Sequence, residues 1–279
     1  MSRRRIVAIA LLAACLATLP GLVQAGAVLD RVMKSKTLVM STDPTYPPQS
    51  FQKPDGNFDG FDVAVGREIA RRLGVELKLV TPAWETVTAG NWGGRWDISV
   101  GSMTVTEERA KVLNFPAIYY YTPAVFAVHK DSKAIHKIAN LNGKKIGVCV
   151  GCTYEAFLTG KLQLTNAPPF KVQVKAGEVK TYDTDTGAFD DLKLGDGKRL
   201  DAVLSAQPTV QDAIKGGYPL RIVGEPVFYE PLAVSVDKGD DEFAAKIKEI
   251  VAAMHKDGTL SRLSQKYYGT DLTKAKATS

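Results

Sequence analysis

Residues 61–80 read FDVAVGREIARRLGVELKLV, and they predict a helix followed directly by a strand. Apolar residues recur at helical spacing from Phe61 to Leu73, so we expect one face of this helix to be buried. Gly74 comes next, and glycine is the residue that most readily adopts the left-handed conformation of a helix C-cap. Residues 75–79 then alternate between apolar and polar side chains, which is typical of a half-buried strand.

Strands are also predicted on both sides of this unit, at residues 37–41 and 96–100. A strand, a helix and a further strand in succession indicate a parallel-rich sheet covered by helices, and therefore an α/β fold. The pattern then restarts with a strand at 145–148 and a helix at 153–162. Further elements follow as strands at 171–174, 201–204, 220–223 and 232–236, and as helices over Phe243–Met254 and Leu260–Tyr267.

The predicted elements suggest two lobes rather than two consecutive domains. The C-terminal helices carry a wide apolar face that needs a sheet to cover it, and the first α/β unit lacks a finished end. We therefore expect the chain to leave the first unit near Tyr120–Val125 and to return near Glu225–Pro231. Lobe 1 would comprise residues 26–121 and 226–279, and lobe 2 residues 122–225, with a mixed sheet and flanking helices in each and two hinge segments between them.

The first 25 residues have the pattern of an export signal. Three arginines precede an apolar run from Ile6 to Ala17, and a small-residue cleavage site ends at Ala25. This run is too short to span a bilayer as a helix. We expect a signal peptide over residues 1–25 and a periplasmic mature protein. A lipoprotein-like sequence at Leu12–Cys15 leaves a second reading, in which Cys15 carries a lipid anchor.

The charge of the chain argues against a nucleic-acid partner. The formal net charge is +6, and it falls to +3 once the three arginines of the leader are removed. There is no run of five lysines or arginines in the sequence. We therefore expect a small-molecule ligand and no nucleic acid.

Two cysteines, Cys149 and Cys152, remain after the predicted cleavage. An exported protein meets an oxidising compartment, so we expect a disulfide, although free thiols or a redox-active pair remain alternatives. A zinc site needs several ligands at suitable spacing, and the histidines show no such pattern. These are His129, His136 and His255. We predict neither a metal nor a cofactor.

Residues 102–109, SMTVTEER, follow a predicted strand and combine hydroxyls with one arginine. If Thr106 caps a helix, Arg109 lies in the first turn of that helix. A guanidinium beside a helix N-terminus suits a carboxylate, which it can hold through two charge-assisted hydrogen bonds. The alternative is an ordinary capped helix with a solvated arginine.

A similar helix start, Gly151–Tyr154, follows a strand of the second unit, although it could also be an ordinary capped helix. Tyr46, in a proline-rich loop, and Trp84 are aromatic candidates for stacking on a ligand, or else for packing within their own lobe. Open α/β sheets place ligands at the carboxyl ends of parallel strands, so we expect these groups to meet in one cleft. The common catalytic motifs, including nucleophile-elbow, zincin, phosphate-loop and dinucleotide-binding patterns, are absent from the sequence.

Taken together, several short motifs resemble the extracellular solute-binding protein family 3, the polar amino-acid receptors of ABC importers. They extend over nearly the whole mature chain. They are Asp43–Pro48, Gly60–Asp62, Trp96–Ile98, Met103–Arg109 with Asn114–Phe115, Gly147–Tyr154, Leu200–Ala202, His255–Thr259 and Lys266–Gly269. The resemblance implies a two-lobed periplasmic-binding-protein type II fold with two hinge strands.

The resemblance also implies roles for individual residues. Arg109 would pair with the α-carboxylate of the ligand, helped by Ser102, Thr104 and the Thr153 backbone. Two aromatic side chains, Tyr46 and Trp84, would enclose the side chain of the ligand, and Asp43 could meet a cationic one.

One departure from the family pattern concerns the α-ammonium group of the ligand. Many members carry an acid shortly after the strand that begins at Asp201, where this chain has Ala206 and Gln207. A buried ammonium without a partner would be costly. Either Asp183, Asp185 or another acid replaces the missing one, or the ligand is not an ordinary α-amino acid.

We therefore expect a periplasmic solute-binding protein of an ABC importer, without catalytic residues, that closes as a monomer on a carboxylate-bearing solute. A dehydratase-like enzyme on the same fold is the alternative from another class, and it would need a general acid in the cleft. A sensor domain is a third reading.

Overall fold

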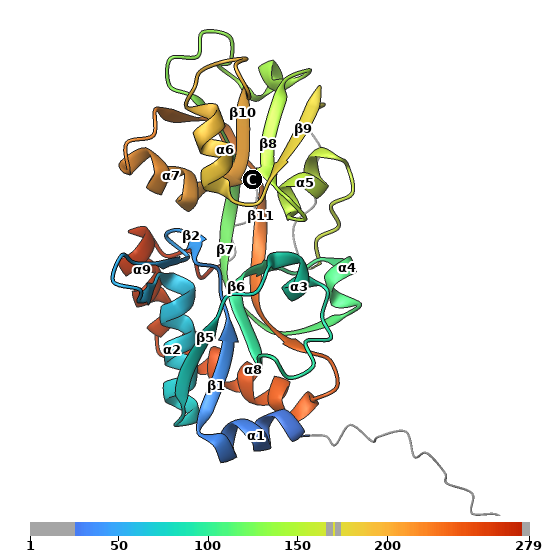
Figure 1. Cartoon of the computed structure of the whole chain (residues 1–279), viewed down its shortest axis with the longest axis vertical. Helices are drawn as coiled ribbons and strands as arrows, with labels where there is room; N and C mark the ends of the chain where they lie inside the picture. The colour runs from blue at the N-terminus through green and yellow to red at the C-terminus, as the bar shows by residue number, and fades with distance from the viewer. Residues whose placement is uncertain (1–25, 166–169, 171–173, 275–279) are drawn as a thin grey trace, which may run out of the picture.

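The computed structural model describes residues 26–165, 170 and 174–274, which form two lobes stacked along the long axis of the molecule (Figure 1). One sheet of eight strands extends through both lobes. Its strands are β1 (Thr37–Ser41), β5 (Glu76–Val80), β6 (Ile98–Thr104), β7 (Leu113–His129), β8 (Lys145–Cys149), β9 (Glu178–Tyr182), β10 (Ala202–Ala206) and β11 (Leu220–Asp237). A small second sheet contains β2 (Thr45–Tyr46), β3 (Ser50–Gln52) and β4 (Phe58–Asp59).

The strand order β5-β1-β6-β11-β7-β10-β8-β9 explains the division into lobes. Strands β5, β1 and β6 are parallel to one another, and so are β10, β8 and β9. The long strands β7 and β11 lie between these two sets and are antiparallel to each other. Each lobe therefore has three parallel strands of its own and shares two long strands with the other lobe.

Helices cover the sheet in both lobes. They are α1 (Ala27–Ser35), α2 (Phe61–Leu73), α3 (Trp84–Thr88), α4 (Glu107–Ala110), α5 (Thr153–Leu158), α6 (Asp185–Leu192), α7 (Gln207–Lys215), α8 (Asp241–Lys256) and α9 (Thr259–Tyr268), with a short 3₁₀ helix at Ile138–Leu141. Within the described part of the chain, no helix combines the length and the apolar character needed to cross a membrane.

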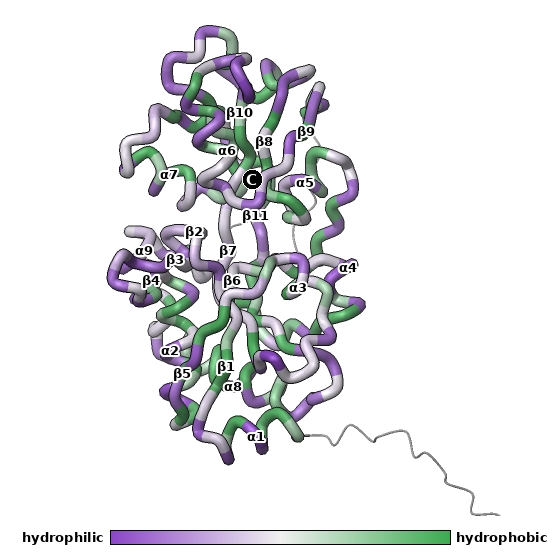
Figure 2. Tube along the Cα trace, in the orientation of Figure 1, coloured by the Kyte–Doolittle hydropathy of each residue, from purple (hydrophilic) through white to green (hydrophobic). Residues whose placement is uncertain are grey.

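The long strands contribute to the hydrophobic cores of both lobes. Tyr120 of β7 and Leu232 of β11 pack in the core of the first lobe, whereas Phe126 of β7 and Phe228 of β11 pack in the second. Hydrophobic residues gather along the central strands of each lobe (Figure 2). The two cores are separate, so β7 and β11 form the covalent connection between two compact bodies.

Most predicted elements are confirmed, and some boundaries are wrong. The helix at 61–73 is α2, and Gly74 caps it with φ of 70°. The helix predicted to end at Leu162 stops at Leu158. The strands predicted at 220–223 and 232–236 are parts of the single strand β11. The strand predicted at 171–174 lies almost entirely outside the described residues, as does the predicted signal peptide.

Candidate functional site

A cavity of about 370 Å³ lies between the lobes and is lined by residues of both. It is formed where the parallel strands end, because the chain leaves β1, β6, β8 and β9 directly into its wall. The cavity contains all seven predicted ligand-binding residues and both cysteines. These are Asp43, Tyr46, Trp84, Ser102, Thr104, Arg109, Thr153, Cys149 and Cys152.

Arg109 is a buried cation on the wall of this cavity. Thr106 is the N-cap of α4, and its hydroxyl accepts a hydrogen bond from the backbone N–H of Arg109, as predicted. The side chain is only 9% exposed, and among residues 26–165, 170 and 174–274 no carboxylate oxygen lies within 4.0 Å of its guanidinium. Burial lowers the pKa of Arg109 to about 10, so the group is still charged at neutral pH.

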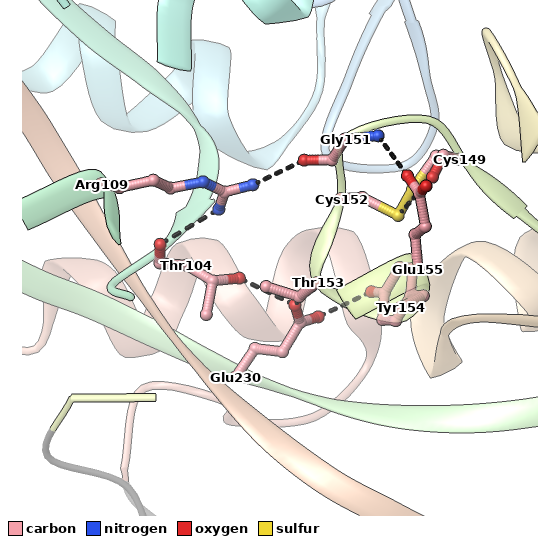
Figure 3. The surroundings of a disulfide bond; sticks show 9 residues. All are labelled: Thr104, Arg109, Cys149, Gly151, Cys152, Thr153, Tyr154, Glu155 and Glu230. Atoms are coloured by element: carbon pink, nitrogen blue, oxygen red, sulfur yellow. Dashed lines mark hydrogen bonds between the residues drawn. A yellow bond between two sulfur atoms is a disulfide. The ribbon is translucent and has the colours of Figure 1, made fainter. Parts of the chain in front are cut away.

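The guanidinium of Arg109 bridges the two lobes (Figure 3). Its Nη1 donates to the carbonyl of Thr104 at 3.1 Å, and its Nη2 donates to the carbonyl of Gly151 in the other lobe at 3.2 Å. The indole of Trp84 lies beneath it, 5.2 Å from ring centroid to Cζ. A guanidinium has five N–H donors. Three of them therefore have no acceptor among the described residues.

Glu230 is a site residue that the sequence did not reveal. It lies on β11, is 3% exposed, and accepts hydrogen bonds from hydroxyls of both lobes (Figure 3). Thr104 donates to Oε1 at 2.7 Å, and Thr153 donates to the same oxygen. Tyr154 donates to Oε2 at 2.6 Å, and Thr122 donates to Oε2 at 3.3 Å. The carboxylate thus joins α5 of the second lobe to β6 of the first.

Ser102 has an unusual backbone conformation, with φ of 53°, which a non-glycine residue adopts only when its surroundings enforce it. Its hydroxyl donates to Asp62 at 2.6 Å, and its N–H donates to the hydroxyl of Tyr119 at 2.9 Å. Tyr119 in turn donates to Asp62 at 2.7 Å. Burial raises the pKa of Asp62 to about 7. This network fixes the position of Ser102 on the cavity wall.

Asp43, Asp183 and Asp185 make one part of the cavity wall acidic, and we call this part the acidic end. Asp43 follows β1 and its Oδ1 accepts from the N–H and the hydroxyl of Thr45, at 2.7 and 2.8 Å. Asp183 follows β9, and Asp185 begins α6. Ala206, at the end of β10, is fully buried and is not on the cavity wall.

The disulfide between Cys149 and Cys152 is present, as predicted. It closes the loop between β8 and α5, and Cys152 is the N-cap residue of α5. The carbonyl of Gly151 in this loop accepts from Arg109, and its N–H donates to Glu155 at 2.8 Å (Figure 3). The disulfide therefore constrains the backbone that contacts Arg109.

The described residues contain no group of three or more histidine, cysteine, aspartate or glutamate side chains arranged to hold a metal ion. The cavity can instead offer the guanidinium of Arg109, several hydroxyls and the carboxylates of its acidic end. It is suited to a small organic molecule that carries both an anionic and a cationic group.

Comparison with known proteins finds relatives whose names state that they bind amino acids. The L-cystine-binding protein TcyJ of Escherichia coli (strain K12) is 32% identical over 249 residues, which cover 88% of each chain. The L-arginine-binding protein of Pseudomonas aeruginosa is 29% identical over 245 residues, covering 85% of this chain and 90% of its own.

Solved structures agree with the fold. The P235GK mutant of ArgBP from T. maritima superposes with a TM-score of 0.74 at 29% identity, covering 87% of this chain and 99% of that one. The ancestral amino acid-binding protein AncCDT-1, a precursor of cyclohexadienyl dehydratase, gives 0.75 at 29% identity, with coverage of 87% and 100%. The sequence profile of the bacterial extracellular solute-binding proteins, family 3, matches residues 38–270. The chain belongs to this family of bacterial extracellular solute-binding proteins.

Proposed function

We propose that this protein is the periplasmic receptor of an ABC importer, and that it captures an amino acid or a close derivative in the cavity between its lobes. Relatives whose names state amino-acid binding, TcyJ among them, support this class of ligand. The observation that carries the proposal is the buried guanidinium of Arg109, which has no carboxylate partner among the described residues. Burying a charge without a counter-ion is costly, so an anionic ligand group would be stabilised there.

The proposed binding mode follows from the donors that remain free. The ligand carboxylate would take the unused N–H groups of Arg109 and the backbone N–H of Thr153. The hydroxyl of Thr104 already donates to Glu230, so we assign Thr104 a positioning role through its carbonyl contact with Arg109. Trp84 and Tyr46 would enclose the ligand, because both line the cavity.

We also propose that the lobes close by bending at the long strands. We place the crossings at residues 120–124 of β7 and 228–232 of β11, because neighbouring residues there belong to different hydrophobic clusters. Closure by bending at a few strand residues is a common mode of domain motion around a ligand. Each ligand must bind the closed state more tightly than the open one to shift this equilibrium.

Export and partners are part of the same proposal. Removal of residues 1–25 as a signal peptide would release a monomer into the periplasm, and a lipid on Cys15 is the alternative form of attachment. The closed form would deliver its ligand to the permease of an ABC importer.

The ligand is identified first by a screen, and calorimetry with that ligand then tests the role of Arg109. A thermal-shift screen of amino acids, with prephenate and arogenate included, identifies the ligand, because binding raises the melting temperature by mass action. Turnover of prephenate or arogenate would contradict the receptor function and would support the alternative, a dehydratase-like enzyme. We expect Arg109→Ala to weaken binding by about 30-fold or more, which corresponds to about 2 kcal/mol for a lost charged partner.

Arg71→Ala is the matched control for this substitution, because the Arg71 side chain is 70% exposed and lies on α2 away from the cavity. We expect it to bind as the wild type does. Affinity that is unchanged in a folded Arg109→Ala protein would overturn the proposed binding mode.

A further inference from the structure

The charges that line the cavity do not balance. Among the described residues, its wall has one cationic side chain, Arg109, and five carboxylates. The carboxylates are Asp43, Glu85, Asp183, Asp185 and Glu230. A zwitterion with one ammonium and one carboxylate adds no net charge, so it would leave this excess of negative charge uncompensated. The charge pattern favours a ligand with more positive than negative groups.

Asp185 shows where a positive group is missing. The residue is 7% exposed, and its Oδ1 is buried without a hydrogen-bond partner among the described residues. The hydroxyl of Ser205 is the neighbouring donor and lowers the pKa of Asp185, but in the described part of the chain this hydroxyl also has no hydrogen-bond partner. No lysine, arginine or histidine of the described ranges forms an ion pair with it. Buried polar atoms are nearly always satisfied, so an unpartnered carboxylate oxygen on a cavity wall is a place where a ligand can supply the donor.

We infer that Asp185 is the counter-ion for a cationic group of the ligand, and that the ligand is a net cationic amino acid. This inference rests on the proposed function for the carboxylate end of the same cavity. The cationic group would lie between Asp185 of the second lobe and Asp43 of the first, whose charges are close enough to interact.

The groups facing Asp185 increase its need for a cation. Burial raises the pKa of Asp185 to about 6, and the carboxylates of Asp43 and Glu230 add to this effect. Tyr46 and Tyr154 also interact with it, and burial raises the pKa of both phenols, so they are neutral at physiological pH. A cation at this position lowers the pKa of Asp185 again, because an opposite charge favours the ionised carboxylate.

The acidic end has room for an extended side chain. A hollow of about 190 Å³ adjoins the cavity there, and Asp43 and Asp183 line both spaces. The hydroxyls of Ser41 and Thr42 line the hollow and are buried without hydrogen-bond partners in the described part of the chain. A guanidinium or ammonium carries several N–H donors, and these carboxylates and hydroxyls are acceptors for them.

An organic cation fits better than a metal ion. In the described ranges, the carboxylates of the cavity do not approach one another as a metal-ligand group. A metal ion needs several carboxylates around one point, whereas the terminal charge of a long side chain can pair with a single carboxylate.

L-arginine and L-citrulline provide a matched test, because they have nearly the same shape and differ in the charge of the terminal group. We expect calorimetry at pH 7.5 to show binding of L-arginine at least about tenfold tighter than binding of L-citrulline. Asp185→Asn should reduce this preference to less than about threefold. Asp190→Asn is the control, since Asp190 lies on the same helix and pairs with Lys193 outside the cavity.

The pH dependence gives a second readout. L-arginine should bind more weakly as the pH falls from 7 to 5, because Asp185 must lose its proton to pair with the cation. Asp185→Asn should flatten this dependence. Equal affinity for the two amino acids, or a preference and a pH dependence that persist in a folded Asp185→Asn protein, overturns the inference and leaves the role of Arg109 intact. Failure of every amino acid to bind contradicts the proposed function itself.

Discussion

Replacing Thr153 with valine removes one hydroxyl from the cavity and leaves the backbone N–H of α5 in place. That hydroxyl donates to Oε1 of Glu230, the same oxygen that accepts from Thr104 at 2.7 Å. Thr104 belongs to the first lobe and Thr153 to the second, so one oxygen can hold both donors only while the lobes are close. Thr153→Val should therefore destabilise the closed form selectively.

The size of the effect follows from the charge and burial of the acceptor. A hydrogen bond to a charged group contributes about 1.5–3 kcal/mol. Glu230 is 3% exposed, so water does not replace the lost donor, although three other hydroxyls still donate to the carboxylate. We expect the ligand found in the screen to bind roughly 10- to 100-fold more weakly to Thr153→Val.

A double-mutant cycle with Glu230→Gln isolates the contact. If the hydroxyl acts through Glu230, the two substitutions together should cost less than the sum of their separate effects, by about 1 kcal/mol or more. Thr159→Val is the control, because among the described residues the hydroxyl of Thr159, at the end of α5, donates to carbonyls of its own helix and to no other acceptor. Additive effects in calorimetry, within about 0.5 kcal/mol, would refute the reasoning.

Two further predictions concern the walls of the cavity. The double variant Cys149→Ser, Cys152→Ser should bind the ligand several-fold more weakly, because the carbonyl of Gly151 is then less restrained against Arg109. Calorimetry of the wild-type protein with a reducing agent should give the same affinity as the double variant. Unchanged affinity in both would refute this prediction. Asp62→Asn should remove a pH dependence of stability. The folded protein keeps a proton on Asp62 up to about pH 7, whereas the unfolded chain releases it near pH 4. The free energy of unfolding of the wild type therefore falls by a few kcal/mol as the pH rises from about 4 to about 7. Urea unfolding at pH 5 and pH 8 measures the change in the free energy of unfolding. An equal change in the wild type and in Asp62→Asn would contradict the prediction.

Local patterns predicted most elements because each pattern reports on burial. The apolar face of α2 and the alternation in β5 reflect one buried side of each element. The long strand β11 was divided in the prediction because Gly224 and two prolines interrupt its apolar pattern. The structure accommodates them with a register shift between Val223 and Phe228, and the strand continues. Such a shift depends on pairing with β7, which local sequence does not contain.

The candidate site was predictable where it follows strand ends and unpredictable within a strand. Arg109 and Thr153 lie just after β6 and β8, so the rule for α/β sheets indicated their place. Glu230 lies inside β11, between apolar residues, and only the hydroxyls of two lobes give it a role. Its one signal in the sequence is an acidic residue in a strand that is otherwise buried, and a buried acid requires partners.

In the proposed mechanism, Arg109 and the acidic end would have opposite effects on closure of the lobes. At the Arg109 end, contacts between protein groups already join the lobes, through the carbonyl of Gly151 and through Glu230. At the acidic end, closing brings Asp43 of one lobe toward Asp185 of the other, and like charges repel more strongly when water is excluded. A ligand that binds only at the Arg109 end leaves this repulsion in place, whereas one that also carries a cation removes it. The balance between open and closed forms thus depends on the charge at the acidic end, and selectivity for the ligand and closure of the lobes follow from the same interaction.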